Sequence, residues 1–429
     1  MFSKLGIRKN FRFENLYIVL LCSFAFFLPI SEKISTLLII ASLLVAFLGL
    51  RNQGRGNLKN CVFLILLYAI YIVAYARDGV GFGLHWFETK ASFLIFPLLF
   101  YLSPLDRPGL IKVLKAFVLG CVISYFVCLL HPFIFNFDWS AMEFIPLRTD
   151  KVSLPVQNEN YGWLNYFVSI GFNNTIDRAY LACYSVFSLV FLVIFHKKFE
   201  RQTLLGLIFL LIVALIQIGS MSGILSLSTI PFLIFLYFGQ AKIKLISVGF
   251  YLLVFFAFYT VTDRFQGYYT EVTTALEEGN SDYDTILNDR MAFWKSAIEV
   301  FRENPVFGHG VGTAQEMMNQ EQQKVLEWSD QWVNYSNFNA HNLYLQLMIE
   351  TGIVGIALFL LAVVWFLYRL NDYPRDLKFL GYSFMVLFCV HSISESMFNR
   401  YVGIAFFTFF YSLILTLNNQ GPTIEKEVL

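Results

Sequence analysis

The sequence predicts an all-α, polytopic integral membrane protein with about twelve transmembrane helices and a large helical loop outside the membrane. Of its 429 residues, 57% are hydrophobic and only 14% are charged, whereas soluble domains are about a quarter charged. Apolar runs long enough to cross a bilayer, roughly 20 residues, recur along almost the whole chain. A chain of this composition exposes most of its surface to lipid.

Two long polar segments, at 132–175 and 262–342, lie between the transmembrane spans that these apolar runs predict. These divide the chain into an N-terminal membrane bundle (1–261), an extracytoplasmic loop (262–342) and a C-terminal membrane bundle (343–429). The predicted spans are 15–31, 34–50, 60–76, 88–103, 110–131, 176–195, 203–219, 221–238, 243–261, 343–368, 377–393 and 401–417.

Basic residues set the orientation, because the short cytoplasmic loops of membrane proteins are rich in Lys and Arg. With the N-terminus in the cytoplasm, every short inside loop is basic, and more than half of the 31 Lys and Arg lie inside. Both termini are therefore expected in the cytoplasm, and 262–342 outside. The six cysteines fall in apolar runs, which favours packing over a disulfide framework or a metal site.

The segment 290–303 is predicted to be an amphipathic helix whose apolar stripe is Met291, Trp294, Ile298 and Phe301. A second helix is expected at 313–328.

Between the two helices, the run FGHGVGT carries Gly308, Gly310 and Gly312. A simple turn is the favoured interpretation. The alternative is a cradle that points backbone N–H groups at an anion.

His341 lies where the chain re-enters the membrane, at the first turn of the tenth predicted span. The partial positive charge of a helix N-terminus favours a neutral imidazole and nearby anions, and a neutral His is suited to general-base chemistry. The alternative is a capping or interfacial histidine.

Two stretches, RMAFWKSAIEVFRENPVFGHGVGTA (290–314) and AHNLYLQLMIETGIVGIALFL (340–360), together resemble the signature of the O-antigen ligase/polymerase family. Weaker similarity extends over 88–100, 177–187 and 394–413. The resemblance implies a metal-independent, inverting glycosyltransferase without a cofactor. His341 matches the family's essential His and Arg290 its loop Arg. Met221 stands where members often have an Arg that helps to hold the diphosphate.

Such an enzyme moves a glycan from a polyprenyl diphosphate carrier onto an acceptor sugar, and the leaving diphosphate needs cations around it. The cationic candidates are Arg290, Arg178, Arg400 and Lys90.

Asn342, Gly310, Gly312 and Glu395 complete the expected substrate-binding set. For each arginine the alternative role is to anchor the topology of the chain in the membrane. In that case Arg178 pairs with the neighbouring Asp177, and Arg400 forms an ion pair with Glu395. Glu350, an intramembrane carboxylate, is expected either to orient an arginine or to be a buried packing partner.

Three functions follow, and the two glycan-transferring ones act at the periplasmic face of the bacterial inner membrane. The first is ligation of O-antigen to lipid A-core. The second is polymerisation of O-antigen or exopolysaccharide repeat units, and the two stay open because they differ only in the acceptor. The third, a flippase for lipid-linked oligosaccharide, is expected to show internal repeats and broken midplane helices, which the sequence lacks. The expected partners are the lipid-linked donor, a lipid A-core or glycan acceptor and membrane lipid, with no nucleic acid.

Overall fold

The computed structural model is helical over almost all of the residues that it describes. Apolar segments of this length form helices because a helix satisfies every backbone N–H and C=O internally. The described segments are 2–49, 56–77, 88–135, 178–218, 286–326 and 339–417, with single or paired residues within 137–144 and 220–252.

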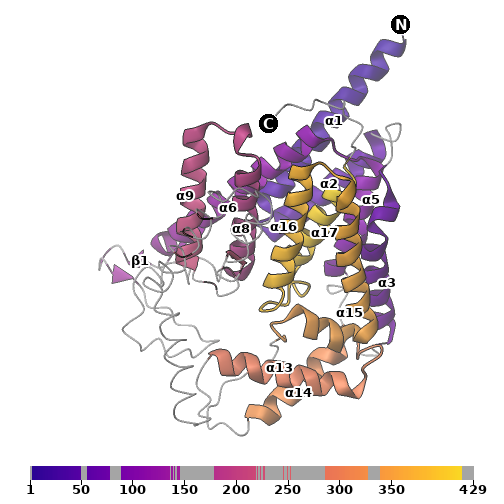
Figure 1. Cartoon of the computed structure of the whole chain (residues 1–429), viewed down its shortest axis with the longest axis vertical. Helices are drawn as coiled ribbons and strands as arrows, with labels where there is room; N and C mark the ends of the chain where they lie inside the picture. Colours follow the sequence, from indigo (N-terminus) through magenta and orange to yellow (C-terminus); the bar gives the residue numbers. More distant parts are fainter. Residues whose placement is uncertain are drawn as a thin grey trace.

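Long helices run alongside one another and form a bundle, and two further helices lie across one end of it (Figure 1). The bundle contains α1 (Phe2–Phe27), α2 (Glu32–Gly49), α3 (Val62–Arg77), α5 (Ser92–Leu102), α6 (Arg107–Phe135), α8 (Arg178–Ile194), α9 (Arg201–Ile218), α15 (Leu343–Arg369), α16 (Arg375–His391) and α17 (Tyr401–Leu415). The crossing helices are α13 (Ile286–Glu303) and α14 (Val311–Leu326). Short 3-10 turns lie at Leu58–Cys61, His196–Lys198 and Leu370–Asp372, and β1 (Phe137–Asp138) pairs with β2 (Glu143–Phe144).

All predicted spans except 221–238 and 243–261 overlap one of these helices. Those two spans lie largely outside the described residues. Within the described residues, 4 helices are long and apolar enough to cross a membrane, namely Leu58–Arg77, Arg107–Leu130, Arg201–Ile218 and Leu343–Asp372. Apart from the short β1–β2 pair, the described part of the protein is therefore that of a helical membrane protein. The count of twelve spans, the orientation and the domain boundaries stay predictions.

Aromatic packing around α17 forms the centre of the bundle. Every residue of α17 from Val402 to Leu415 is buried. Phe406 and Phe410 contact Phe187 of α8 and Phe384 of α16 at ring-centroid distances of 4.9 to 6.1 Å. Helices in lipid associate through close packing rather than through exclusion of water, and tilted aromatic pairs add to this attraction.

The amphipathic helix predicted at 290–303 is confirmed as α13, but its buried face is centred one position away from the predicted apolar stripe, of which Phe301 still packs on the buried cluster. The buried face carries Phe293, Ala297 and Val300, whereas Ile298 is 39% exposed. Small Ala297 lets α13 approach its neighbours closely, and this face packs with Ala314 of α14 and Ile349 of α15 in one cluster. The helix expected at 313–328 is confirmed as α14.

The glycine turn between α13 and α14 docks onto a kink in α15. At Gly352 the helix has a φ of 66°, and this break leaves carbonyls before it and N–H groups after it without helical partners. The turn supplies those partners: His309 N and Gly310 N donate to Ile349 O (2.9 Å) and Glu350 O (3.0 Å), while Ile353 N donates to Pro305 O (2.8 Å). The helices α13 and α14 are thereby joined to α15.

Gly308→Ala is expected to destabilise this junction. Gly308 has a φ of 65°, and an added Cβ would lie 2.6 Å from Glu350 C and Thr351 N. Strain of this kind costs on the order of 1–3 kcal/mol, before the displacement of α15 backbone is counted. The thermal unfolding of purified variants in detergent measures the effect. Gly206→Ala on α9 is the matched control, because nothing lies within 4 Å of its added Cβ; equal midpoints for the two variants would contradict the docking role.

Candidate active site

His341 lies directly before α15, at the end of the bundle that α13 and α14 cover. Among the described residues it is the only residue other than glycine with a positive φ, 44°. That conformation is uncommon for a non-glycine residue, although histidine tolerates it better than most. Its N–H donates to Asn339 Oδ1 at 2.8 Å, so the turn is held on the N-terminal side.

Asn342 holds the turn on the C-terminal side. Its side-chain oxygen caps α15 by accepting from Tyr344 N (2.9 Å) and Leu345 N (3.1 Å). Its amide nitrogen donates to Ile393 O at 3.0 Å, and its own N–H donates to Ser396 Oγ at 3.0 Å. The structure therefore uses the side chain of Asn342, predicted to bind substrate, as scaffold.

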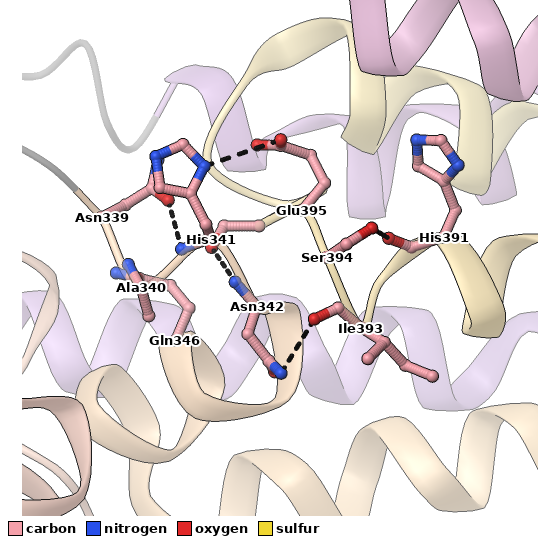
Figure 2. A network of polar contacts seen from close by, with 10 residues as sticks. Asn339, Ala340, His341, Asn342, Gln346, His391, Ile393, Ser394 and Glu395 are labelled. Atoms are coloured by element: carbon pink, nitrogen blue, oxygen red, sulfur yellow. Dashed lines mark hydrogen bonds and ion pairs between the residues drawn. The ribbon is translucent and has the colours of Figure 1, made fainter. Parts of the chain in front are cut away.

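The loop between α16 and α17 (392–400) wraps this helix start and brings a carboxylate to the imidazole (Figure 2). Glu395 Oε2 lies 3.7 Å from His341 Nδ1, with side-chain exposures of 10% and 28%. The basic side chain beside Glu395 is therefore His341, in place of the Arg400 expected from the sequence. The tight turns of the loop direct Glu395 towards α15, whereas Arg400 lies at the start of α17 and is exposed.

An aromatic ring from α13 covers the other side of His341. The ring of Phe293 stacks on the imidazole with centroids 5.8 Å apart and an interplanar angle of 29°. Residues three apart on a helix share a face. Arg290 is half-exposed and lies three positions before Phe293, so it is on the same side of α13 as the ring that stacks on His341. The loop arginine therefore belongs to the helix face that meets the histidine, and its role in the reaction stays a prediction.

Lys90, a cationic candidate for the diphosphate, is buried inside the bundle. It is 2% exposed, and its ammonium group lies 4.0 Å from Glu350 Oε2 and 4.5 Å from the centre of the Tyr71 ring. It also donates to Phe398 O. Glu350 therefore orients a lysine rather than an arginine, inside the bundle.

The remaining predicted residues lie further from this arrangement or beyond the described side chains. Gly310 donates its N–H to Glu350 O, which favours the turn interpretation over an anion cradle at that position. Gly312 lies in the first turn of α14. Arg178 begins α8, and its side chain, like Met221, lies outside the described part of the structure.

Sequence reasoning missed three residues near the site. Phe293 was overlooked because the apolar stripe predicted for 290–303 included Trp294, one position further along α13. Gln346 carried a usable signal, since it is a polar residue in an apolar span, four positions before Glu350 and thus on the same helix face. Arg77, at the end of α3, lies over the Phe307 ring at 5.3 Å, and no local motif marked it.

Comparison with known proteins places the histidine and loop arginine in a shared domain. Residues 206–360 match the O-antigen ligase family. The resemblance predicted from the sequence is thereby confirmed. The family match contains Arg290, His341 and Glu350 and ends before Glu395. An uncharacterized protein of Haemophilus influenzae is 25% identical over 229 residues, which are 50% of this chain and 55% of that protein. The alignment therefore covers only about half of the relative.

Within the described residues, no group of three or more His, Cys, Asp or Glu is arranged to hold a metal ion.

Glu395→Gln is expected to slow glycan transfer by about 10-fold or more, because a carboxylate 3.7 Å from Nδ1 favours the protonated imidazole that a general base forms during transfer. The glutamine keeps the size of the side chain but not its charge. Glu299→Gln, which removes an exposed α13 carboxylate paired with Arg302, is the control and should transfer as wild type. The measurement is the transfer rate of purified variants. Equal rates for Glu395→Gln and wild type would remove Glu395 from the site.

Proposed function

We propose that the protein is a glycosyltransferase that moves a polyprenyl-diphosphate-linked glycan onto an acceptor sugar at the periplasmic face of the bacterial inner membrane. The observation that carries this proposal is the histidine at the start of α15. It is partly exposed, has a carboxylate 3.7 Å from Nδ1, and lies within the segment that matches the O-antigen ligase family.

His341 acts as the general base. With Nδ1 turned towards Glu395, Nε2 is left to accept a proton from the acceptor hydroxyl. The hydroxyl oxygen forms a bond to the anomeric carbon while the bond from that carbon to the diphosphate oxygen breaks. The electron pair leaves with the diphosphate, and the proton passes to His341. One displacement of this kind inverts the anomeric configuration.

Arg290 stabilises the departing diphosphate. Its planar guanidinium suits two phosphate oxygens at once, and charge that develops on a leaving group in a site of low dielectric is where a fixed cation contributes most. The proposed reaction needs no metal and no cofactor, since the diphosphate is already a good leaving group.

The preferred acceptor is lipid A-core, which makes the protein an O-antigen ligase. Repeat-unit polymerisation is the second candidate, because the same match to the O-antigen ligase family and the same histidine serve an acceptor that is itself a lipid-linked glycan.

Surface glycans of a deletion strain distinguish the two. A ligase is supported if long chains disappear from lipid A while carrier-linked polymer accumulates. Lipid A-core capped with a single repeat unit would instead show a polymerase. Unchanged surface glycans, with complementation by the wild-type gene as the control, would contradict both.

A further inference from the structure

We propose that Gln346, Glu350 and Lys90 form a buried relay that positions His341, and that Lys90 acts inside this relay rather than on the substrate. The inference rests on the proposed transfer reaction and names further positioning residues for it. All three side chains are at most 2% exposed.

The relay reaches the backbone directly before His341. Gln346 Oε1 accepts from Ala340 N at 3.0 Å, and Gln346 Nε2 donates to Glu350 Oε1 at 2.8 Å. On its other oxygen, Glu350 lies 4.0 Å from the Lys90 ammonium group. The Ala340 N–H is buried, so an acceptor must be present there to avoid an orphaned donor. Figure 2 shows Gln346 under the peptide that leads into His341.

The charge of Glu350 determines which way the Gln346 amide faces. A carboxylate accepts hydrogen bonds but cannot donate them, whereas an amide has one end of each kind. Because Glu350 accepts on one side and the Ala340 N–H donates on the other, only one orientation of the amide satisfies both. A protonated carboxyl or an amide at position 350 offers a donor as well as an acceptor, so the selection would be weaker.

The Lys90 ammonium group is the basic partner of Glu350 inside the bundle. An intramembrane carboxylate is costly unless it has a partner, and a buried charge that loses its partner is strongly destabilising. Besides Glu350, the groups that face the ammonium group are the Phe398 carbonyl and the Tyr71 ring. These contacts come from three different elements, so Lys90 is enclosed by protein, and reaching a diphosphate would require it to leave them.

The held conformation explains why a relay is needed. His341 has a φ of 44°, a region in which a non-glycine residue persists only when its surroundings enforce it. Asn339 and Gln346 each accept from a peptide N–H of this turn, and Asn342 caps the helix that follows it. Removing the Gln346 contact frees the N-terminal peptide of the turn and lets the imidazole move away from Glu395.

Gln346→Met tests the relay, since methionine is unbranched and of similar size but can neither accept from Ala340 nor donate to Glu350. We expect kcat for transfer to fall at least 10-fold with KM for the lipid-linked donor unchanged. Gln217→Met is the matched control, because it breaks another glutamine pair, the partly buried one with Tyr125, on a different helix. Equal kcat values for Gln346→Met and Gln217→Met would overturn the relay.

The charge pair gives a second, sharper test. Lys90→Met and Glu350→Gln should each lower kcat and leave donor KM unchanged. The double variant should be faster than either, because it buries no unpartnered charge and the amide oxygen introduced at position 350 still accepts from Gln346. If Lys90 binds the diphosphate instead, Lys90→Met raises donor KM and the double variant is no better. That result would overturn the assignment of Lys90.

A readout without substrate separates the relay from the proposed function. Carbethoxylation of His341 by diethyl pyrocarbonate, followed by mass spectrometry with His309 as the internal reference, reports how the imidazole is held. A several-fold change in Gln346→Met but not in Gln217→Met supports the relay, and an unchanged rate overturns it. Wild-type protein that transfers no glycan would refute the proposed function without affecting this measurement.

Discussion

Replacing His341 with asparagine is expected to abolish detectable glycan transfer while the folded protein still binds its lipid-linked donor. A general base contributes roughly 10²–10⁴-fold to rate, and His341 has the Glu395 carboxylate 3.7 Å from Nδ1 to stabilise its protonated form. Asparagine is chosen because it tolerates the left-handed backbone conformation that position 341 requires. His341→Ala should lose activity equally but with lower stability.

His309→Ala is the control for this prediction. His309 Nε2 lies 2.8 Å from Val300 O, so this histidine joins the end of α13 to the glycine turn and should affect stability more than chemistry. The measurement is the transfer rate of each purified variant, with donor binding measured separately, and it shows which histidine is the base. Near-normal transfer by His341→Asn together with loss in His309→Ala would show that the base is assigned to the wrong histidine.

Removal of the Arg290 side chain is expected to slow transfer by on the order of 10²-fold, the effect typical of a lost contact to developing charge in a preorganised site. Arg290→Lys should fall between Arg290→Ala and wild type, because lysine keeps the charge but loses the planar fork. Both variants should retain the fold, since Arg290 is half-exposed at the start of α13.

Arg302→Ala provides the matched control on the same helix. Arg302 is exposed and pairs with Glu299 at 2.7 Å, and such surface pairs contribute little to stability. It should transfer as wild type. If Arg290→Ala and Arg302→Ala have the same rate, the loop arginine does not act on the donor.

Local signals in the sequence predicted much of the helical framework. Long apolar runs marked spans such as 343–368, now α15, and helical periodicity marked α13. The face of α13 was assigned wrongly because Trp294 and Ile298 looked like the stronger apolar stripe, whereas close packing favoured small Ala297. A pattern of hydrophobicity does not reveal how near a neighbouring helix will approach.

The contacts that shape the candidate site are long-range, and this is why the sequence could not supply them. Lys90 and Glu350 lie in different helical segments far apart in the chain, and nothing local pairs them. The carboxylate of Glu395 lies beside His341 rather than Arg400 because the turns of the loop between α16 and α17 point it towards the start of α15. The break at Gly352 is likewise visible only once Pro305 and Val306 are seen to satisfy it.

The most direct test of the account is transfer by the purified protein in detergent, from a polyprenyl-diphosphate-linked glycan to lipid A-core or to a second lipid-linked glycan, with a metal chelator present. We expect the glycosylated acceptor and free polyprenyl diphosphate to appear in equal amounts, with inverted anomeric configuration, and the product to vanish in His341→Asn. No product from either acceptor, together with movement of the intact donor between leaflets in proteoliposomes, would contradict the account and show a flippase instead.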